Sequence, residues 1–140
     1  MKKYFLRLIL VLSAALSYAQ WQPNFRLTID PSVSYLSYNN AHCLAANGDN
    51  LHVVWWDGRN SNGEIYYNRS TDNGLDWQTD TRLTNSPGHS EYPSIAVYDS
   101  IVHIVWTDER DETYYPEIYY KHSTDGGQSW SVDEKLTANP

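Results

Sequence analysis

Pairs of oppositely charged residues stand two positions apart at two places in the sequence. Asp57 precedes Arg59, and Asp108 precedes Arg110. Because a planar guanidinium group binds a carboxylate through two parallel hydrogen bonds, each arginine is suited either to hold a carboxylated ligand or to pair with the nearby aspartate. A single active site has no reason to be repeated along a chain, so the repetition favours a structural role for both pairs.

Other residues with ligand-binding chemistry occur only once. His89, Glu91 and Tyr92 precede an apolar segment, and Tyr114 and Tyr115 stand beside an acidic run. Aromatic and charged side chains on loops are typical of ligand contacts, and they also serve in ordinary loop packing. These five residues are the non-repeating candidates for contact with a ligand.

The elements that would position these side chains follow from an internal repeat. An octapeptide of the form Ser-x-Asp-x-Gly-x-x-Trp occurs twice, about fifty residues apart, which is the length of one propeller blade. Its defining residues are Ser70, Asp72, Gly74 and Trp77 in the first copy, and Ser123, Asp125, Gly127 and Trp130 in the second. A His-x-Val-Trp segment and a Glu-Ile-Tyr-Tyr segment precede both copies, so the repeat extends well beyond the octapeptide.

Each repeat contains four short segments rich in β-branched and aromatic residues, bounded by turn residues. We expect strands at 41–46, 51–56, 65–69 and 81–84, and again at 93–97, 101–106, 118–122 and 132–137. The segment 51–56 carries apolar bulk on both faces, so adjacent sheets should pack face to face. The predicted fold class is all-β, a β-propeller of four-stranded antiparallel blades, six-bladed when complete. A solenoid of such sheets is the structural alternative.

The octapeptide resembles the Asp-box, or bacterial neuraminidase repeat, of sialidases and other secreted propellers. This resemblance covers both repeats and implies a secreted protein that binds or hydrolyses extracellular glycans, with an extracellular glycan or glycoprotein as partner. Because the family includes propellers without catalysis, a non-catalytic interaction or surface scaffold is the alternative. The resemblance assigns ligand contact to the loop between the second and third strands and the loop entering the inner strand. The candidates there are Asp57, Arg59, Asp108, Arg110, His89, Glu91, Tyr92, Tyr114 and Tyr115, and no catalytic residue is assigned.

The octapeptide itself is best interpreted as a structural turn. The carboxylates of Asp72 and Asp125 can accept backbone N–H groups that lack strand partners, and Gly74 and Gly127 supply a positive φ. The alternative is a calcium loop that would use Asp72 and Asp76. Ser129 replaces Asp76 in the second copy and too few oxygen ligands are present, so we predict neither a metal nor a cofactor.

The sequence also divides into regions. Residues 1–19 are basic and then apolar, the pattern of a signal peptide, so we expect a secreted protein without a membrane anchor in this segment. Residues 20–40 should be an outer strand and linker, 41–84 the first blade and 85–140 the second. The segment 21–28 repeats the outer-strand pattern and should close the ring, with three partner strands expected beyond Pro140 and supplied by the remaining blades of the same protein. A formal net charge of −7 argues against nucleic acid.

Overall fold

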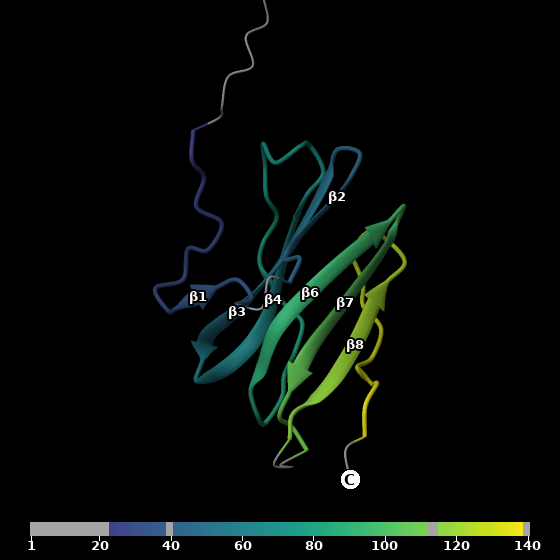
Figure 1. Cartoon of the computed structure of the whole chain (residues 1–140). Coiled ribbons are helices and arrows are strands. Elements are labelled where there is room, and N and C mark those ends of the chain that lie inside the picture. Colours follow the sequence, from purple (N-terminus) through teal and green to yellow (C-terminus); the bar gives the residue numbers. More distant parts are fainter. Residues whose placement is uncertain (1–22, 39–40, 112–114, 139–140) are drawn as a thin grey trace, which may run out of the picture.

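The computed structural model describes residues 23–38, 41–111 and 115–138, and this part of the chain is all-β, as predicted. Its strands form two antiparallel sheets (Figure 1). The first sheet contains β1 (Ser34–Tyr35), β2 (Leu44–Asn47), β3 (Asn50–Asn60), β4 (Asn62–Ser70) and β5 (Thr81–Arg82). The second contains β6 (Ser90–Tyr98), β7 (Ile101–Asp108), β8 (Glu117–Ser123) and β9 (Glu134–Lys135). The predicted signal peptide and Tyr114 lie outside the described residues.

Both sheets have the strand order that the repeat predicts. β3 pairs with β2 and with β4, and β4 pairs with β5; the second sheet has the order β6-β7-β8-β9. In the first sheet β2 pairs with the beginning of β3 and β1 pairs with its later part, at Trp56 and Asp57. β1 and β2 therefore together occupy the edge that β6 alone occupies in the second sheet. Residues 23–28, predicted as a closing strand, have no strand partner in the part of the chain that the structure describes.

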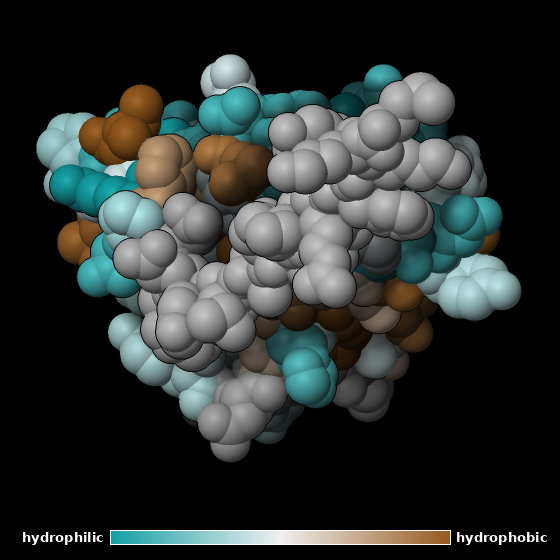
Figure 2. Space-filling view, turned by 90° about the horizontal axis from the view of Figure 1, so that it is seen from above, coloured by the Kyte–Doolittle hydropathy of each residue, from teal (hydrophilic) through white to brown (hydrophobic). Residues whose placement is uncertain are grey.

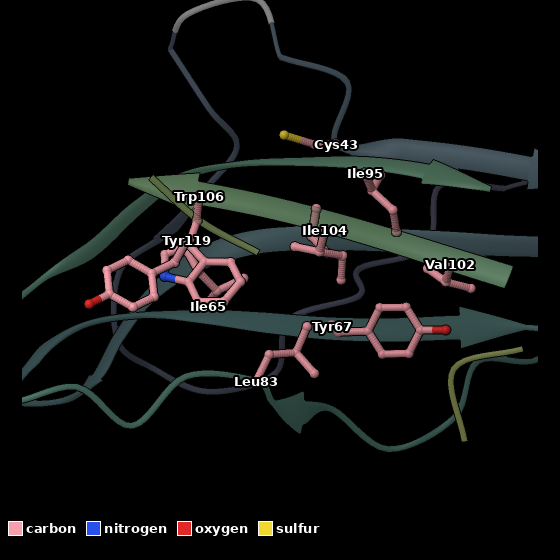
Figure 3. Packing of buried hydrophobic residues seen from close by; sticks show 10 residues of the cluster. Cys43, Ile65, Tyr67, Leu83, Ile95, Val102, Ile104, Trp106 and Tyr119 are labelled. Carbon is pink, nitrogen blue, oxygen red and sulfur yellow. The ribbon is translucent and has the colours of Figure 1, made fainter. Parts of the chain in front are cut away.

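The two sheets pack face to face around one apolar core (Figure 3). The first sheet contributes Val54, Ile65 and Tyr67 to this core, and the second contributes Ile104 and Trp106; all five side chains are buried. Each such side chain contributes roughly 1.5–3 kcal/mol relative to its exposed state. In the view from above, hydrophobic residues also reach the surface between hydrophilic ones (Figure 2), so the core leaves some apolar surface uncovered.

Polar contacts fix the position of one sheet against the other. The hydroxyl group of Ser90 donates to Asp108 at 3.0 Å within the second sheet and to Glu64 of the first sheet at 3.5 Å. Ser86 lies on the connection between the sheets, where its backbone N–H donates to Glu64 at 3.1 Å and its hydroxyl to Asp108 at 3.1 Å. Lys121 of β8 donates to the backbone carbonyl of Leu83. Because these groups are buried, each bond also satisfies an atom that would otherwise destabilise the interface.

The two octapeptide turns, residues 70–77 and 123–130, have the same hydrogen-bonding plan. The Asp72 carboxylate accepts the Ser70 hydroxyl at 2.6 Å and the Asp76 N–H at 3.0 Å. Asp125 accepts the Ser123 hydroxyl at 2.7 Å and both the N–H and the hydroxyl of Ser129. These donors lower the pKa of both aspartates, Asp72 mainly through the Asp76 N–H and Asp125 mainly through the Ser129 hydroxyl.

Candidate functional site

The first charged pair, Asp57 and Arg59, forms a hydrogen-bonded ion pair near the end of β3. The guanidinium group of Arg59 donates to Asp57 through Nε at 2.9 Å and through Nη2 at 2.7 Å, and it reaches Asp80 at 3.1 Å. Trp55 Nε1 and the Ser34 hydroxyl also donate to Asp57, each at 2.9 Å. Asp57 is therefore saturated with donors and fully buried.

The second pair repeats this arrangement. Arg110 donates to Asp108 at 2.9 and 2.7 Å and pairs with Asp133 at 2.8 Å, while Trp106 Nε1 donates to Asp108 at 2.7 Å. Each guanidinium group also lies 4.2 Å from the centre of a tyrosine ring, Tyr66 for Arg59 and Tyr119 for Arg110. Since both arginine forks are occupied by carboxylates and cover aromatic rings, the geometry supports the structural role over ligand binding.

These bonds make the stability of the first sheet sensitive to acid. Burial raises the pKa of Asp57, but hydrogen bonds from Arg59, Trp55 and Ser34 outweigh it and lower the pKa from 3.8 to about 2. Because the folded-state pKa lies below the unfolded one, ionised Asp57 stabilises the fold above about pH 4, and this contribution is lost as the pH falls toward about 2. Urea unfolding of the wild type across this range should lose stability more steeply than unfolding of Asp57→Asn. Parallel pH profiles would contradict the assignment.

A second group of residues is confined to the first repeat. Tyr35 stacks on Trp56 with ring centroids 4.3 Å apart and planes 12° apart, and Tyr38 lies 4.9 Å from Tyr35. In the second sheet the register places Glu91 and Thr107 at the positions of Tyr35 and Trp56, so this stack has no counterpart there. The sequence reasoning missed it, because Tyr35 and Trp56 are 21 positions apart and only the pairing of β1 with β3 brings them together.

Two of the predicted candidates, Glu91 and Tyr92, lie close enough to this stack for their charges to act on Tyr35. Burial raises the pKa of Tyr35, and the nearby charges of Glu91, Tyr38 and Tyr92 raise it further. Tyr92 is 40% exposed and has a φ of 52°, a left-handed conformation that costs a non-glycine residue about 1–3 kcal/mol. It lies where the register of β6 and β7 shifts between Glu91 and Ser94. Bulges and strained residues of this kind are over-represented at functional sites.

We call Tyr35, Tyr38, Trp56, Glu91 and Tyr92 the aromatic cluster. Gly63 allows the Trp56 indole to lie on the backbone of β4, because a Cβ there would stand 1.9 Å from Trp56 Nε1. That buried indole N–H has no hydrogen-bond acceptor in the described part of the chain. Tyr38 is 72% exposed, so the aromatic cluster contains both a packed indole, that of Trp56, and a ring that solvent can reach, that of Tyr38.

The remaining candidates lie outside this cluster. The His89 ring accepts the Gly63 N–H at 3.2 Å and its carbonyl accepts the Glu109 N–H at 2.9 Å, so it connects the two sheets. Tyr115 is exposed in the loop between β7 and β8. Within residues 23–38, 41–111 and 115–138, no group of three or more His, Cys, Asp or Glu side chains could hold a metal ion.

Comparison with known proteins gives no family assignment. No protein-family model matches the chain, and no curated protein is significantly similar to it. In the described residues, no helix is long and apolar enough to cross a membrane.

Proposed function

We propose that the protein is a secreted Asp-box β-propeller that binds extracellular glycans through the aromatic cluster. The propeller part is supported by two successive sheets of like strand order packed face to face. A closed ring needs about 4 to 8 such sheets. The binding part is carried by one observation: the stack of Tyr35 on Trp56, with Tyr38 4.9 Å from Tyr35, has no counterpart in the second sheet, where Glu91 and Thr107 hold these positions.

The chemistry of the aromatic cluster suits a sugar. A pyranose ring presents an apolar C–H face that packs on an aromatic ring, while its hydroxyl groups need acceptors at the edge. Tyr38 and Tyr92 provide exposed rings, and Glu91 provides a carboxylate that accepts hydroxyl hydrogens. Rigid aromatic side chains lose little conformational freedom on binding, which makes them effective contact residues.

Binding has more support than hydrolysis. A sialidase-like hydrolase holds the substrate carboxylate with several arginine forks, beside an acid/base carboxylate and a tyrosine. Arg59 and Arg110 are already held by two carboxylates each, and Arg82 pairs with Glu64 at 2.7 Å. Burial and neighbouring negative charge raise the pKa of Tyr35, which works against its ionisation as a nucleophile.

The test is a glycan-binding measurement with matched tyrosine variants. An array of neutral and sialylated oligosaccharides identifies a ligand, and calorimetry then compares the wild type with Tyr38→Ala and Tyr92→Ala. We expect each variant to bind at least about tenfold more weakly, since a contact aromatic contributes more than about 1.4 kcal/mol. Tyr98→Ala is the control, because Tyr98 is 78% exposed at the opposite end of β6. If no glycan binds, or if Tyr98→Ala weakens binding equally, the proposal fails and the scaffold alternative is favoured.

A further inference from the structure

One face of the second sheet is exposed although the equivalent face of the first sheet is buried. Val105, Ile118 and Leu136 are 36%, 37% and 52% exposed, whereas Val54, Ile65 and Leu83, their equivalents one repeat earlier, are 0%, 0% and 7% exposed. In the first sheet these positions are covered by the second sheet. The exposed face of the second sheet therefore has the residues of an interface without the partner that buries them.

The N-terminal segment contacts the first sheet as the connection between the sheets contacts the second. The sequence Arg26-Leu27-Thr28 corresponds to Arg82-Leu83-Thr84. The Ser34 hydroxyl donates to Asp57 at 2.9 Å, as the Ser90 hydroxyl donates to Asp108 at 3.0 Å. The Gly58 N–H donates to the Val33 carbonyl at 3.0 Å, as the Glu109 N–H donates to the His89 carbonyl at 2.9 Å. Residues 26–34 therefore sit on the first sheet as an outer strand of a preceding sheet would.

The contacts of Leu27 extend this correspondence to the apolar core. Leu27 packs against Val53, Trp55 and Tyr66 on the face of the first sheet that points away from the second. Leu83 belongs to the core that contains their equivalents Ile104, Trp106 and Tyr119. Figure 1 shows the N-terminal segment on the outer side of the first sheet and the C-terminal segment on the outer side of the second.

Among the described residues, no third strand lies beside this N-terminal segment. Arg82 pairs with Glu64 of β4 at 2.7 Å and the Thr84 hydroxyl donates to the same carboxylate, but Arg26 and Thr28 have no such carboxylate in the described part of the chain. A cavity of about 480 Å³ lies between residues 25–29 and Trp77. At the equivalent place beside Trp130, the Tyr67 ring of β4 packs edge-on with centroids 4.9 Å apart. The cavity is thus the space that a tyrosine of a third strand would fill.

We propose that a second copy of this chain supplies that strand in a head-to-tail contact. Strand β8 of the second copy pairs with residues 25–28, so that its Tyr120 enters the cavity beside Trp77 and its Glu117 accepts from Arg26 and Thr28. Val105 and Ile118 of the second copy then cover the face of the first sheet against which Leu27 and Trp77 already pack. The occupant is a copy of this chain because its faces repeat residues already packed together inside it. Val105, Ile118 and Tyr120 correspond to Val54, Ile65 and Tyr67, and Val53, Trp55 and Tyr66 correspond to Ile104, Trp106 and Tyr119.

Residues 26–28 take the place of the second copy's own outer strand in this contact. That strand, β9, is held by the Leu136 N–H, which donates to the Ile118 carbonyl at 2.8 Å, and by Lys135 and Thr137, which both contact Glu117. Leu27, Arg26 and Thr28 offer the same N–H, cationic and hydroxyl groups, so the exchange replaces these bonds with equivalent ones. The contact is heterologous, because each copy donates one N-terminal strand and offers one acceptor sheet. Association can then continue to further copies until a ring closes.

Sedimentation velocity of two complementary variants tests the proposal. Arg26→Glu places a negative charge where Glu117 would dock and blocks the donor strand, and Ile118→Asp blocks the acceptor face. The wild type should associate as concentration rises, and each variant alone should associate at least about tenfold more weakly. Mixed one to one, they should form a heterodimer, because each retains the half that the other lacks. A wild type that stays monomeric, or a mixture that does not recombine, would overturn the proposal.

Two further variants separate strand exchange from other modes of association. Leu27→Pro keeps an apolar side chain but removes the N–H that would donate to β8, as the Leu83 N–H donates to the Ile65 carbonyl at 2.8 Å. It should prevent association, whereas Leu136→Asp, in the displaced strand, should not. The reverse result would refute the exchange. Circular dichroism checks that all variants fold, and no glycan is involved, so this test is independent of the proposed glycan binding.

Discussion

Asp108→Ala should lower the free energy of unfolding by about 3–5 kcal/mol, the typical cost of removing one partner from a buried ion pair. Asp108 is 1% exposed and accepts from Trp106, Ser86, Ser90 and Arg110. Without it, these buried donors lose their acceptor, while water cannot reach them. The free energy of unfolding is measured by urea denaturation with tryptophan fluorescence. Because a small domain is stable by only about 5–15 kcal/mol, we expect part of the Asp108→Ala population to be unfolded even without urea.

Comparison variants identify the source of that loss. Asp57→Ala should cost about the same, because Asp57 is equally buried and has the same Trp and Arg donors. Arg110→Lys should cost less, about 1–3 kcal/mol, since lysine keeps the charge but not the planar fork. If Asp108→Ala costs less than about 1 kcal/mol, or if Arg110→Lys abolishes glycan binding without affecting stability, the pair is part of a binding site and not of the framework.

The repeat predicted the strands well because it reports local pattern and turn chemistry. The segments that begin at Leu51 and Ile101 are short apolar runs rich in β-branched and aromatic residues, and both octapeptides contain the glycine that their turn requires. The structure places β3 and β7 over these segments and extends β3 to Asn60. Outer strands were predicted too long: β5 and β9 each pair over two residues. The length of an edge strand depends on how many of its residues pair with the neighbouring strand, and a local sequence pattern does not contain that information.

The candidate site was harder to predict because it depends on pairing between distant segments. Glu91 and Tyr92 were recognised as non-repeating, and the structure brings them close enough to Tyr35 for their charges to raise its pKa. Tyr35 and Trp56 were not recognised, since β1 is two residues long and pairs with the far end of β3. Comparing the repeats by sheet register would have found them, because Trp56 stands where the second repeat has a threonine.

The packing of the sheets predicts a large difference between two glycines with the same backbone conformation. Gly74 and Gly127 hold the same place in the two octapeptide turns, with φ of 84° and 85°. Alanine at either position is strained by about 1–2 kcal/mol. At Gly74 the atom nearest to the added Cβ would be Leu51 Cδ1 at 3.1 Å, whereas at Gly127 the Cβ would stand 1.9 Å from the Tyr67 hydroxyl oxygen of the other sheet. Gly127→Ala should therefore cost about 1–3 kcal/mol more than Gly74→Ala.

Double variants assign this difference to the interface between the sheets. The backbone strain is common to both glycine variants, so subtracting one free energy of unfolding from the other leaves the clash with Tyr67 less the milder contact with Leu51. Tyr67→Phe removes the closest atom, and the next, Tyr67 Cζ, stands 2.7 Å from the added Cβ. In the Tyr67→Phe background the excess cost of Gly127→Ala should shrink but not vanish, while the cost of Gly74→Ala should not change. Equal costs for the two glycine variants in the wild-type background would mean that the second octapeptide turn does not pack on Tyr67, and that the sheets meet differently in solution.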